Sequence, residues 1–243
     1  MEFFSSIIIY HDILACVSTG LRPQYADICA AALGDDHSKV QLQNIMGCRN
    51  WVMVSIREIA VLWDRKTKMV GRGFLNVVEL RRDAIDIEKR LDVGLERLSG
   101  ELSQVLKSGK AQHDRSQVIV RITQAYAHAA KVYLNVLVSG PNPDLPEIIE
   151  SVTSTLTALV ALPNPELLCS VVWPFCIAGC MAIVDERRAF RGLASAAGVH
   201  RKAFGSSRRA LEVMEMCWKL RNEGRSCDWF DAMEVLRYRV LLV

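Results

Sequence analysis

The feature that most constrains this fold is the segment Leu167–Val184, whose eighteen residues carry no charge. As a helix rising about 1.5 Å per residue it would reach roughly 27 Å, close to the roughly 30 Å hydrocarbon core of a bilayer, so a membrane span is one interpretation. However, Pro174 interrupts the run, Glu166 and Asp185 abut its ends, and amphipathic helices elsewhere offer packing partners. We therefore favour a buried central helix that kinks or restarts at Pro174.

The composition fits a folded chain with no obligatory nucleic-acid partner. With 243 residues, 51% of them hydrophobic, the chain is long enough for a sizeable core in one large or two small domains. Thirty basic and 27 acidic residues leave a net charge of only +3. A dedicated DNA-binding domain is usually more basic, so direct DNA recognition is not predicted.

The eight cysteines are predicted to be free thiols. They fall mostly in apolar segments, and none forms a Cys-x-x-Cys pair of the kind used by zinc fingers or thioredoxin-like sites. Free cysteine is a common small core residue, which favours a reducing, intracellular compartment. The apolar stretch Met1–Tyr10 contains Glu2 and lacks a basic start, so a signal peptide is not expected.

Hydrophobic periodicity predicts helices throughout and no paired strands. Leucines and an isoleucine recur every three or four residues from Ile87 to Leu106, which is typical of one long amphipathic helix. Pro146 suits the first turn of a helix and Asp228 suits an N-cap. The predicted helical segments are 45–63, 87–106, 118–137, 148–160, 167–184, 187–197, 206–220 and 229–242, with loops at 66–73, 109–114 and 139–146.

These patterns predict an all-α fold class. We expect an irregular multi-helix domain, built of packed antiparallel helices around the buried Trp-Pro helix. Residues 1–243 are predicted to form a single helical domain, with the proline-rich loop 139–146 as the place where it would divide if there are two.

The stretch Val171–Arg188, VVWPFCIAGCMAIVDERR, resembles the core signature of the fungal-specific transcription factor domain. This is a helical regulatory domain found downstream of binuclear zinc-cluster motifs. The segments 10–23, 46–60, 125–134, 210–218 and 228–229 resemble further parts of that family in the same order. The signature and core residues that this resemblance assigns are Trp173, Pro174, Gly179, Cys180, Arg187, Trp218 and Trp229.

The resemblance implies a transcriptional regulator that acts in the nucleus and is not an enzyme. In the family this domain serves effector response, self-association and masking of activation function, while six cysteines elsewhere bind two zinc ions and read DNA. No such cysteine spacing occurs here, so the chain is expected to be the C-terminal part of a regulatory domain. No cofactor is expected in it, zinc belongs only to an upstream cysteine cluster, and DNA would be reached only through a missing or partner DNA-binding domain.

Expected partners are other proteins, a second copy of the chain, or a small-molecule effector, and no membrane. The default effector site is an apolar pocket near the Trp-Pro helix. Trp173, Phe175, Trp218 and Trp229 would surround such a pocket, although plain core packing is the favoured explanation for all four.

Two charged features keep other functions open. Asp83 and Asp86 share one helical face and could bind Mg²⁺, as carboxylates do in all-α terpene synthases. The second metal motif of such enzymes is absent, and Arg81 and Arg82 interleave with the acids as on an exposed, salt-bridged helix. A Mg²⁺-dependent all-α enzyme therefore remains an alternative, as does a membrane-associated helical protein.

The second feature is a basic set that is typical of a nuclear import signal, a phosphate-contacting surface or a solvated face. Glu186 and Arg187 are predicted to partner the end of the buried helix. His113 is expected in a polar turn and His128 in or beside the core. The basic surface consists of Arg188, Arg191, Arg201, Lys202, Arg208 and Arg209.

Overall fold

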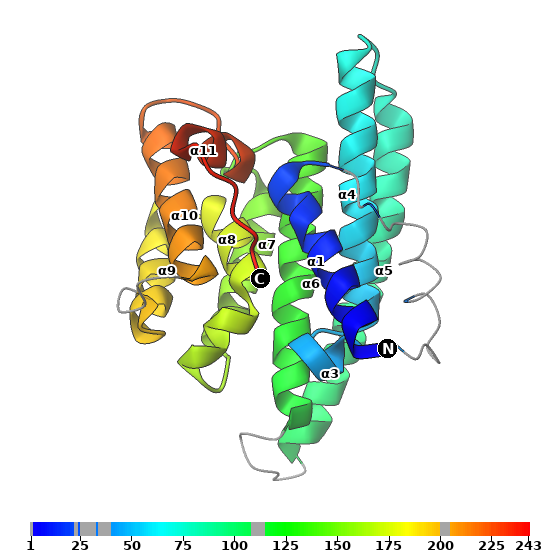
Figure 1. Cartoon of the computed structure of the whole chain (residues 1–243), viewed down its shortest axis with the longest axis vertical. Helices are drawn as coiled ribbons and strands as arrows, with labels where there is room; N and C mark the ends of the chain where they lie inside the picture. The colour runs from blue at the N-terminus through cyan, green and yellow to red at the C-terminus, as the bar shows by residue number, and fades with distance from the viewer. Residues whose placement is uncertain (1, 22–23, 25–32, 34–39, 108–114, 200–204) are drawn as a thin grey trace.

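The computed structural model describes residues 2–21, 24, 33, 40–107, 115–199 and 205–243 (Figure 1). Within these ranges the chain forms helices and no strand, which confirms the all-α prediction. The elements are α1 (Glu2–Thr19), α3 (Gln43–Met46), α4 (Asn50–Gly71), α5 (Val77–Lys107), α6 (Arg115–Ser139), α7 (Pro146–Val160), the 3-10 helix η1 (Pro165–Ser170), α8 (Val172–Cys180), α9 (Val184–Ala196), α10 (Ser206–Asn222) and α11 (Trp229–Leu236).

Helix α6 is the centre of the packing, because it contacts α4, α5, α7 and α8. Most of its apolar side chains are buried, including Tyr126 and Tyr133. The α4–α5 hairpin stands beside α6 and extends beyond the rest of the bundle, while α8 to α11 form the opposite side (Figure 1). The long helix predicted from the Ile87–Leu106 stripe is confirmed as α5.

The apolar run Leu167–Val184 forms three pieces rather than one helix. Residues up to Ser170 belong to η1, α8 begins at Val172, and Val184 starts α9. All nine residues of α8 are buried, as expected of a central helix. The restart lies two residues before Pro174, because the first N–H groups of a helix have no intrahelical partner and a proline is tolerated there. In the described part of the chain no helix combines the length and apolarity needed to cross a bilayer.

The loop predicted at 66–73 was wrong over most of its length, since α4 continues to Gly71. Charge density suggested a loop, yet lysine, arginine and methionine are good helix formers. Tertiary contact adds to this preference, because the Lys66 ammonium donates a hydrogen bond to the Leu137 carbonyl of α6. The turn follows at Gly73, whose φ of 78° suits glycine. At its other end, the apolar set predicted from Ile45 divides at Gly47 into α3 and α4.

Asp228 caps α11 as predicted, but the helix is shorter than expected. The Asp228 carboxylate accepts hydrogen bonds from the N–H groups of Phe230 at 2.8 Å and Asp231 at 3.1 Å. The helix ends at Leu236, and Arg237 has a φ of 59°, so the prediction of helix to Leu242 was wrong. Contacts outside the segment decide this, because the Tyr238 hydroxyl donates to a Glu212 carboxylate oxygen at 2.7 Å.

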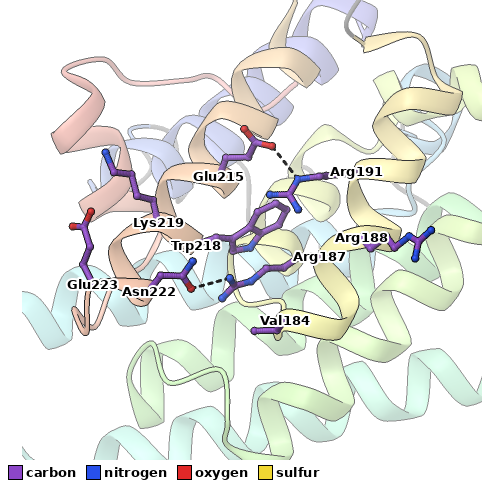
Figure 2. A pocket seen from close by; sticks show the side chains of 9 residues that line it. All are labelled: Val184, Arg187, Arg188, Arg191, Glu215, Trp218, Lys219, Asn222 and Glu223. Atoms are coloured by element: carbon purple, nitrogen blue, oxygen red, sulfur yellow. Dashed lines mark hydrogen bonds and ion pairs between the residues drawn. The ribbon is translucent and has the colours of Figure 1, made fainter.

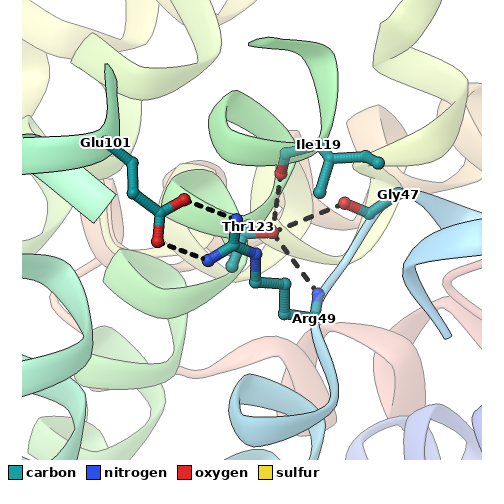
Figure 3. Close-up of polar contacts among 5 residues, drawn as sticks. All are labelled: Gly47, Arg49, Glu101, Ile119 and Thr123. Carbon is teal, nitrogen blue, oxygen red and sulfur yellow. Dashed lines mark hydrogen bonds and ion pairs between the residues drawn. The ribbon is translucent and has the colours of Figure 1, made fainter. Parts of the chain in front are cut away.

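A polar junction joins α3, α4, α5 and α6 (Figure 3). Arg49 donates two hydrogen bonds to the Glu101 carboxylate, at 2.9 and 2.6 Å. The Arg49 N–H also donates to the Thr123 hydroxyl at 3.3 Å, and that hydroxyl donates to the Ile119 carbonyl at 2.6 Å. The hydrogen bonds from Arg49 lower the pKa of Glu101. The junction therefore ties the start of α4 to two helices distant in sequence.

Candidate functional site

Two of the three signature tryptophans, Trp173 and Trp229, lie in a cluster of aromatic rings. Trp173 of α8 stacks on Tyr126 with ring centroids 5.8 Å apart and an interplanar angle of 8°. Trp229 of α11 meets Tyr133 edge to face at 5.6 Å, and Trp63 stacks on the same tyrosine. Trp173 and Trp229 are completely buried. These contacts make both tryptophans part of the packing between α6, α8 and α11.

Helix α8 is held at its C-terminal end by side chains of α10. The Trp218 indole N–H donates to the Gly179 carbonyl at 2.8 Å. Arg221, one turn further along α10, donates to the Cys180 carbonyl and, at 2.7 Å, to the Cys227 carbonyl. Helix C-termini leave their last carbonyls without intrahelical partners. The Gly179 carbonyl also accepts from the Ala182 N–H at 3.2 Å, so Trp218 is its second donor, while Arg221 is the side-chain donor to the Cys180 carbonyl. The sequence analysis missed Arg221; its position i+3 from Trp218 was the signal.

Gly179 allows α10 to approach α8 closely. A Cβ at this position would lie 2.1 Å from the Met214 methyl carbon and 2.8 Å from its sulfur. The neighbouring Cys180 lies beside Cys176 and Cys217, and the Cys217 and Cys227 sulfurs are 3.8 Å apart. Burial raises the pKa of the Cys180 and Cys217 thiols, so they remain neutral.

A surface groove of about 570 Å³ runs between α9 and α10. It is lined in part by Trp218, whose N–H donates to the Gly179 carbonyl. Figure 2 shows Arg187 and Arg191 on either side of the Trp218 ring, with Arg188 pointing away from it. The guanidinium carbons of Arg187 and Arg191 lie 5.7 and 4.7 Å from the centroid of that ring. The groove is lined by Val184, Arg187, Arg188, Arg191, Glu215, Trp218, Lys219, Asn222 and Glu223.

The groove carries an excess of positive charge, since four cationic side chains face two carboxylates. Arg191 donates to the Glu215 carboxylate at 3.1 Å, whereas Arg187 donates to the neutral Asn222 side chain at 3.1 Å. Burial, and then the charges of Arg221 and Arg191, lower the pKa of Arg187. A guanidinium stays protonated despite such a shift, so this charge repels its neighbours.

The predicted partnership of Glu186 and Arg187 takes a different form from the one expected. Glu186 caps the start of α9, accepting hydrogen bonds from the Ile183 N–H at 3.2 Å and from the Thr153 hydroxyl at 2.7 Å. Arg187 faces α10 instead of the end of α8, which Arg221 holds.

The four described residues of the predicted basic surface lie on two helices, α9 and α10. Arg188 and Arg191 belong to the groove. Arg208 and Arg209 lie in the first turn of α10, and both pair with Glu212, one turn before Glu215 of the groove. Arg201 and Lys202 lie outside the described residues, as does His113.

The acidic face considered for Mg²⁺ is occupied by ion pairs. Asp83 pairs with Arg65 and contacts Arg82 at 3.7 Å, and Glu79 lies 3.6 Å from Arg65. In the part of the chain that the structure describes, histidine, cysteine and acidic side chains form no group of three placed to hold a metal ion. His128 is largely buried, which lowers its pKa to about 4.

Comparison with protein families gives one match, which extends over residues 1–243. The matching family is described as the fungal specific transcription factor domain. The homologous proteins include the trichothecene biosynthesis transcription regulator of Trichoderma arundinaceum, which is 34% identical over 223 residues, or 91% of this chain. The ustiloxin B cluster transcription factor ustR of Aspergillus flavus is 30% identical over 251 residues, or 100% of this chain.

The aligned regions cover only 48% and 42% of those two proteins, so the chain spans less than half the length of these relatives. No solved structure matches this chain.

Proposed function

The chain belongs to the fungal-specific transcription factor domain family, and from this premise we propose that it is the regulatory part of a nuclear transcription regulator. It acts through contacts with proteins, including a second copy of itself, and a small-molecule effector adds a further input. DNA is read by a zinc cluster outside this chain or on a partner. The names of the relatives, a transcription regulator and a transcription factor, support this proposal.

One observation carries the regulatory role: Trp218 connects the surface groove to the central helix. Its ring lies beneath two arginines of the groove, and its indole N–H holds the Gly179 carbonyl at the end of α8. A molecule bound in the groove therefore acts one side chain away from the core. A ligand shifts a conformational equilibrium only through different affinities for the two states, and the Trp218 contact is the route by which we propose that such a difference arises.

A reporter assay tests the regulatory role. The chain is fused to a heterologous DNA-binding domain in a fungal host, and transcription of a reporter gene is compared with that from the DNA-binding domain alone. We expect the fusion to change reporter output. Trp218→Phe keeps a ring but removes the N–H donor to Gly179, so it should alter the effect of the fused chain on reporter output. Trp51→Phe, a matched replacement on α4, should leave it intact.

Reporter output equal to that of the DNA-binding domain alone would contradict the proposal. The same holds if Trp218→Phe and Trp51→Phe behave identically while both variants remain folded by circular dichroism. A fluorescent-protein fusion tests the location, since the proposal requires it to accumulate in the nucleus.

The names of two relatives suggest a class of target genes. One is a trichothecene biosynthesis transcription regulator, and the other is a ustiloxin B cluster transcription factor. We propose that this regulator controls genes of a biosynthetic cluster in its own organism. Deleting its gene should lower or raise the transcripts of adjoining biosynthetic genes together. Unchanged transcripts under conditions in which those genes are expressed would argue against this target class.

A further inference from the structure

We propose that the groove lined by Arg187, Arg191 and Trp218 binds an acidic segment of a partner protein. This deepens the proposed function, on which it rests, by naming the site and the chemistry of the partner.

The first argument is the distribution of charge. Val184, Arg187 and Arg191 are spaced by three and four residues, so they share one face of α9, and every charged side chain that α9 contributes to the groove is an arginine. The α10 wall alternates Glu215, Lys219 and Glu223. An acidic chain lying against α9 gains attraction along its length, and it relieves the repulsion among the arginines.

The second argument concerns unused hydrogen-bonding capacity. Among the described residues no carboxylate forms an ion pair with Arg187, which donates instead to the neutral Asn222 amide. Arg191 meets Glu215 through Nε, which leaves its two terminal nitrogens for another acceptor. Arginine presents donors in a planar fork that fits carboxylates in two-bond geometry. Stacking on Trp218 holds both forks in place before a ligand arrives.

The third argument is shape. From Val184 to Arg191 the groove follows two turns of α9, about 10 Å at 1.5 Å per residue, which matches about three residues of an extended chain. Small-molecule sites are mostly apolar and enclose their ligands. This groove is open to solvent and lined mainly by charged side chains (Figure 2). Tryptophan and arginine are also the residues most enriched at the energetic centres of protein interfaces.

Binding of a labelled peptide tests the proposal directly. The probe is a short fluorescein-labelled peptide of alternating aspartate and serine, and its asparagine–serine counterpart is the uncharged control. Fluorescence anisotropy should show that the protein binds the acidic peptide and not the uncharged control. This binding should weaken as added salt screens the charges. The double variant Arg187→Gln, Arg191→Gln should bind at least about 10-fold more weakly, which corresponds to 1.4 kcal/mol.

Matched variants separate the groove from general charge effects. Arg81→Gln with Lys107→Gln removes the same charge from exposed positions of α5 and should leave peptide affinity within about twofold. Glu215→Gln releases Arg191 from its ion pair, so we expect binding to strengthen by about threefold. A gain of affinity in this variant cannot result from its misfolding.

Three results would overturn the inference: no binding of the acidic peptide, equal losses in the groove and control double variants, or weaker binding by Glu215→Gln. Inorganic phosphate or citrate that displaces the peptide at concentrations equal to the peptide's own dissociation constant would show a small-anion site instead. The assay is independent of transcription. Peptide binding without any reporter response contradicts only the proposed function, and a reporter response without peptide binding contradicts only this inference.

Discussion

Replacing Gly179 by alanine tests the close contact between α8 and α10. The new Cβ would meet the Met214 side chain at 2.1 Å from its methyl carbon, 2.8 Å from its sulfur and 3.1 Å from Cγ. Met214 is completely buried, so its flexible end has no free space into which to move. Overpacking a core costs about 1–3 kcal/mol, and alanine regains about 1 kcal/mol of helix propensity. We expect a net loss of up to about 2 kcal/mol in the free energy of unfolding.

A matched control and a double-mutant cycle make the test specific. Gly192→Ala lies on exposed α9 with nothing within 4 Å of the new Cβ, and should stabilise the protein by about 0.5–1 kcal/mol. Met214→Ala removes every atom that the Gly179 Cβ would crowd, at a cost of about 2–5 kcal/mol. Combined with Gly179→Ala it should lose about 1–2 kcal/mol less than the sum of the single changes.

Urea unfolding followed by circular dichroism measures the wild type and all four variants, and equal denaturant slopes allow the midpoints to be compared. The reasoning fails if Gly179→Ala is as stable as Gly192→Ala. It fails equally if the changes at Gly179 and Met214 are additive, because the crowding would then involve other atoms.

Three further outcomes follow from buried groups. Trp173→Ala should lower the free energy of unfolding by about 3–5 kcal/mol, because the ring is completely buried and stacked; a near-zero change in the urea midpoint would contradict its placement. Burial lowers the pKa of His128 to about 4, so between pH 6.5 and 4 only the unfolded state takes up a proton, and the wild type should lose stability as pH falls through this range. Thermal melts of His128→Gln should lack this loss. Burial and the Asp231 charge raise the pKa of Asp228 to about 6, so its contribution is fully present below pH 3.8 and is lost as pH rises through 6. Asp228→Asn retains a capping residue and should gain stability relative to wild type between those values; parallel melting profiles would refute this assignment.

Local sequence patterns were sufficient to predict most helices and the residues at which some of them begin. The leucine stripe of α5, Pro146 at the first turn of α7 and Asp228 at the cap of α11 each act within one or two turns of chain, so they are visible in the sequence. The buried character of α8 followed from its lack of charge.

The candidate site was only partly predictable. In the sequence, Arg187 and Trp218 belonged to a family signature and Arg191 to a basic cluster, and nothing local showed that two arginines would stack on that tryptophan. Arg221 was missed because its acceptors lie in α8 and in the segment before α11. Sequence proximity also grouped Arg208 with Arg188, although Glu212 holds Arg208 elsewhere on α10.

By itself the sequence determined the all-α class, the apolar central segment and the family, because helical periodicity and a motif are properties of neighbouring residues. Only the tertiary structure decided where the helices end and which side chains meet. Beyond Leu236 the Tyr238 hydroxyl reaches Glu212, and Gly179 lets α10 approach α8. Such contacts join residues distant in the chain, and their energies outweigh the local preferences that a sequence displays.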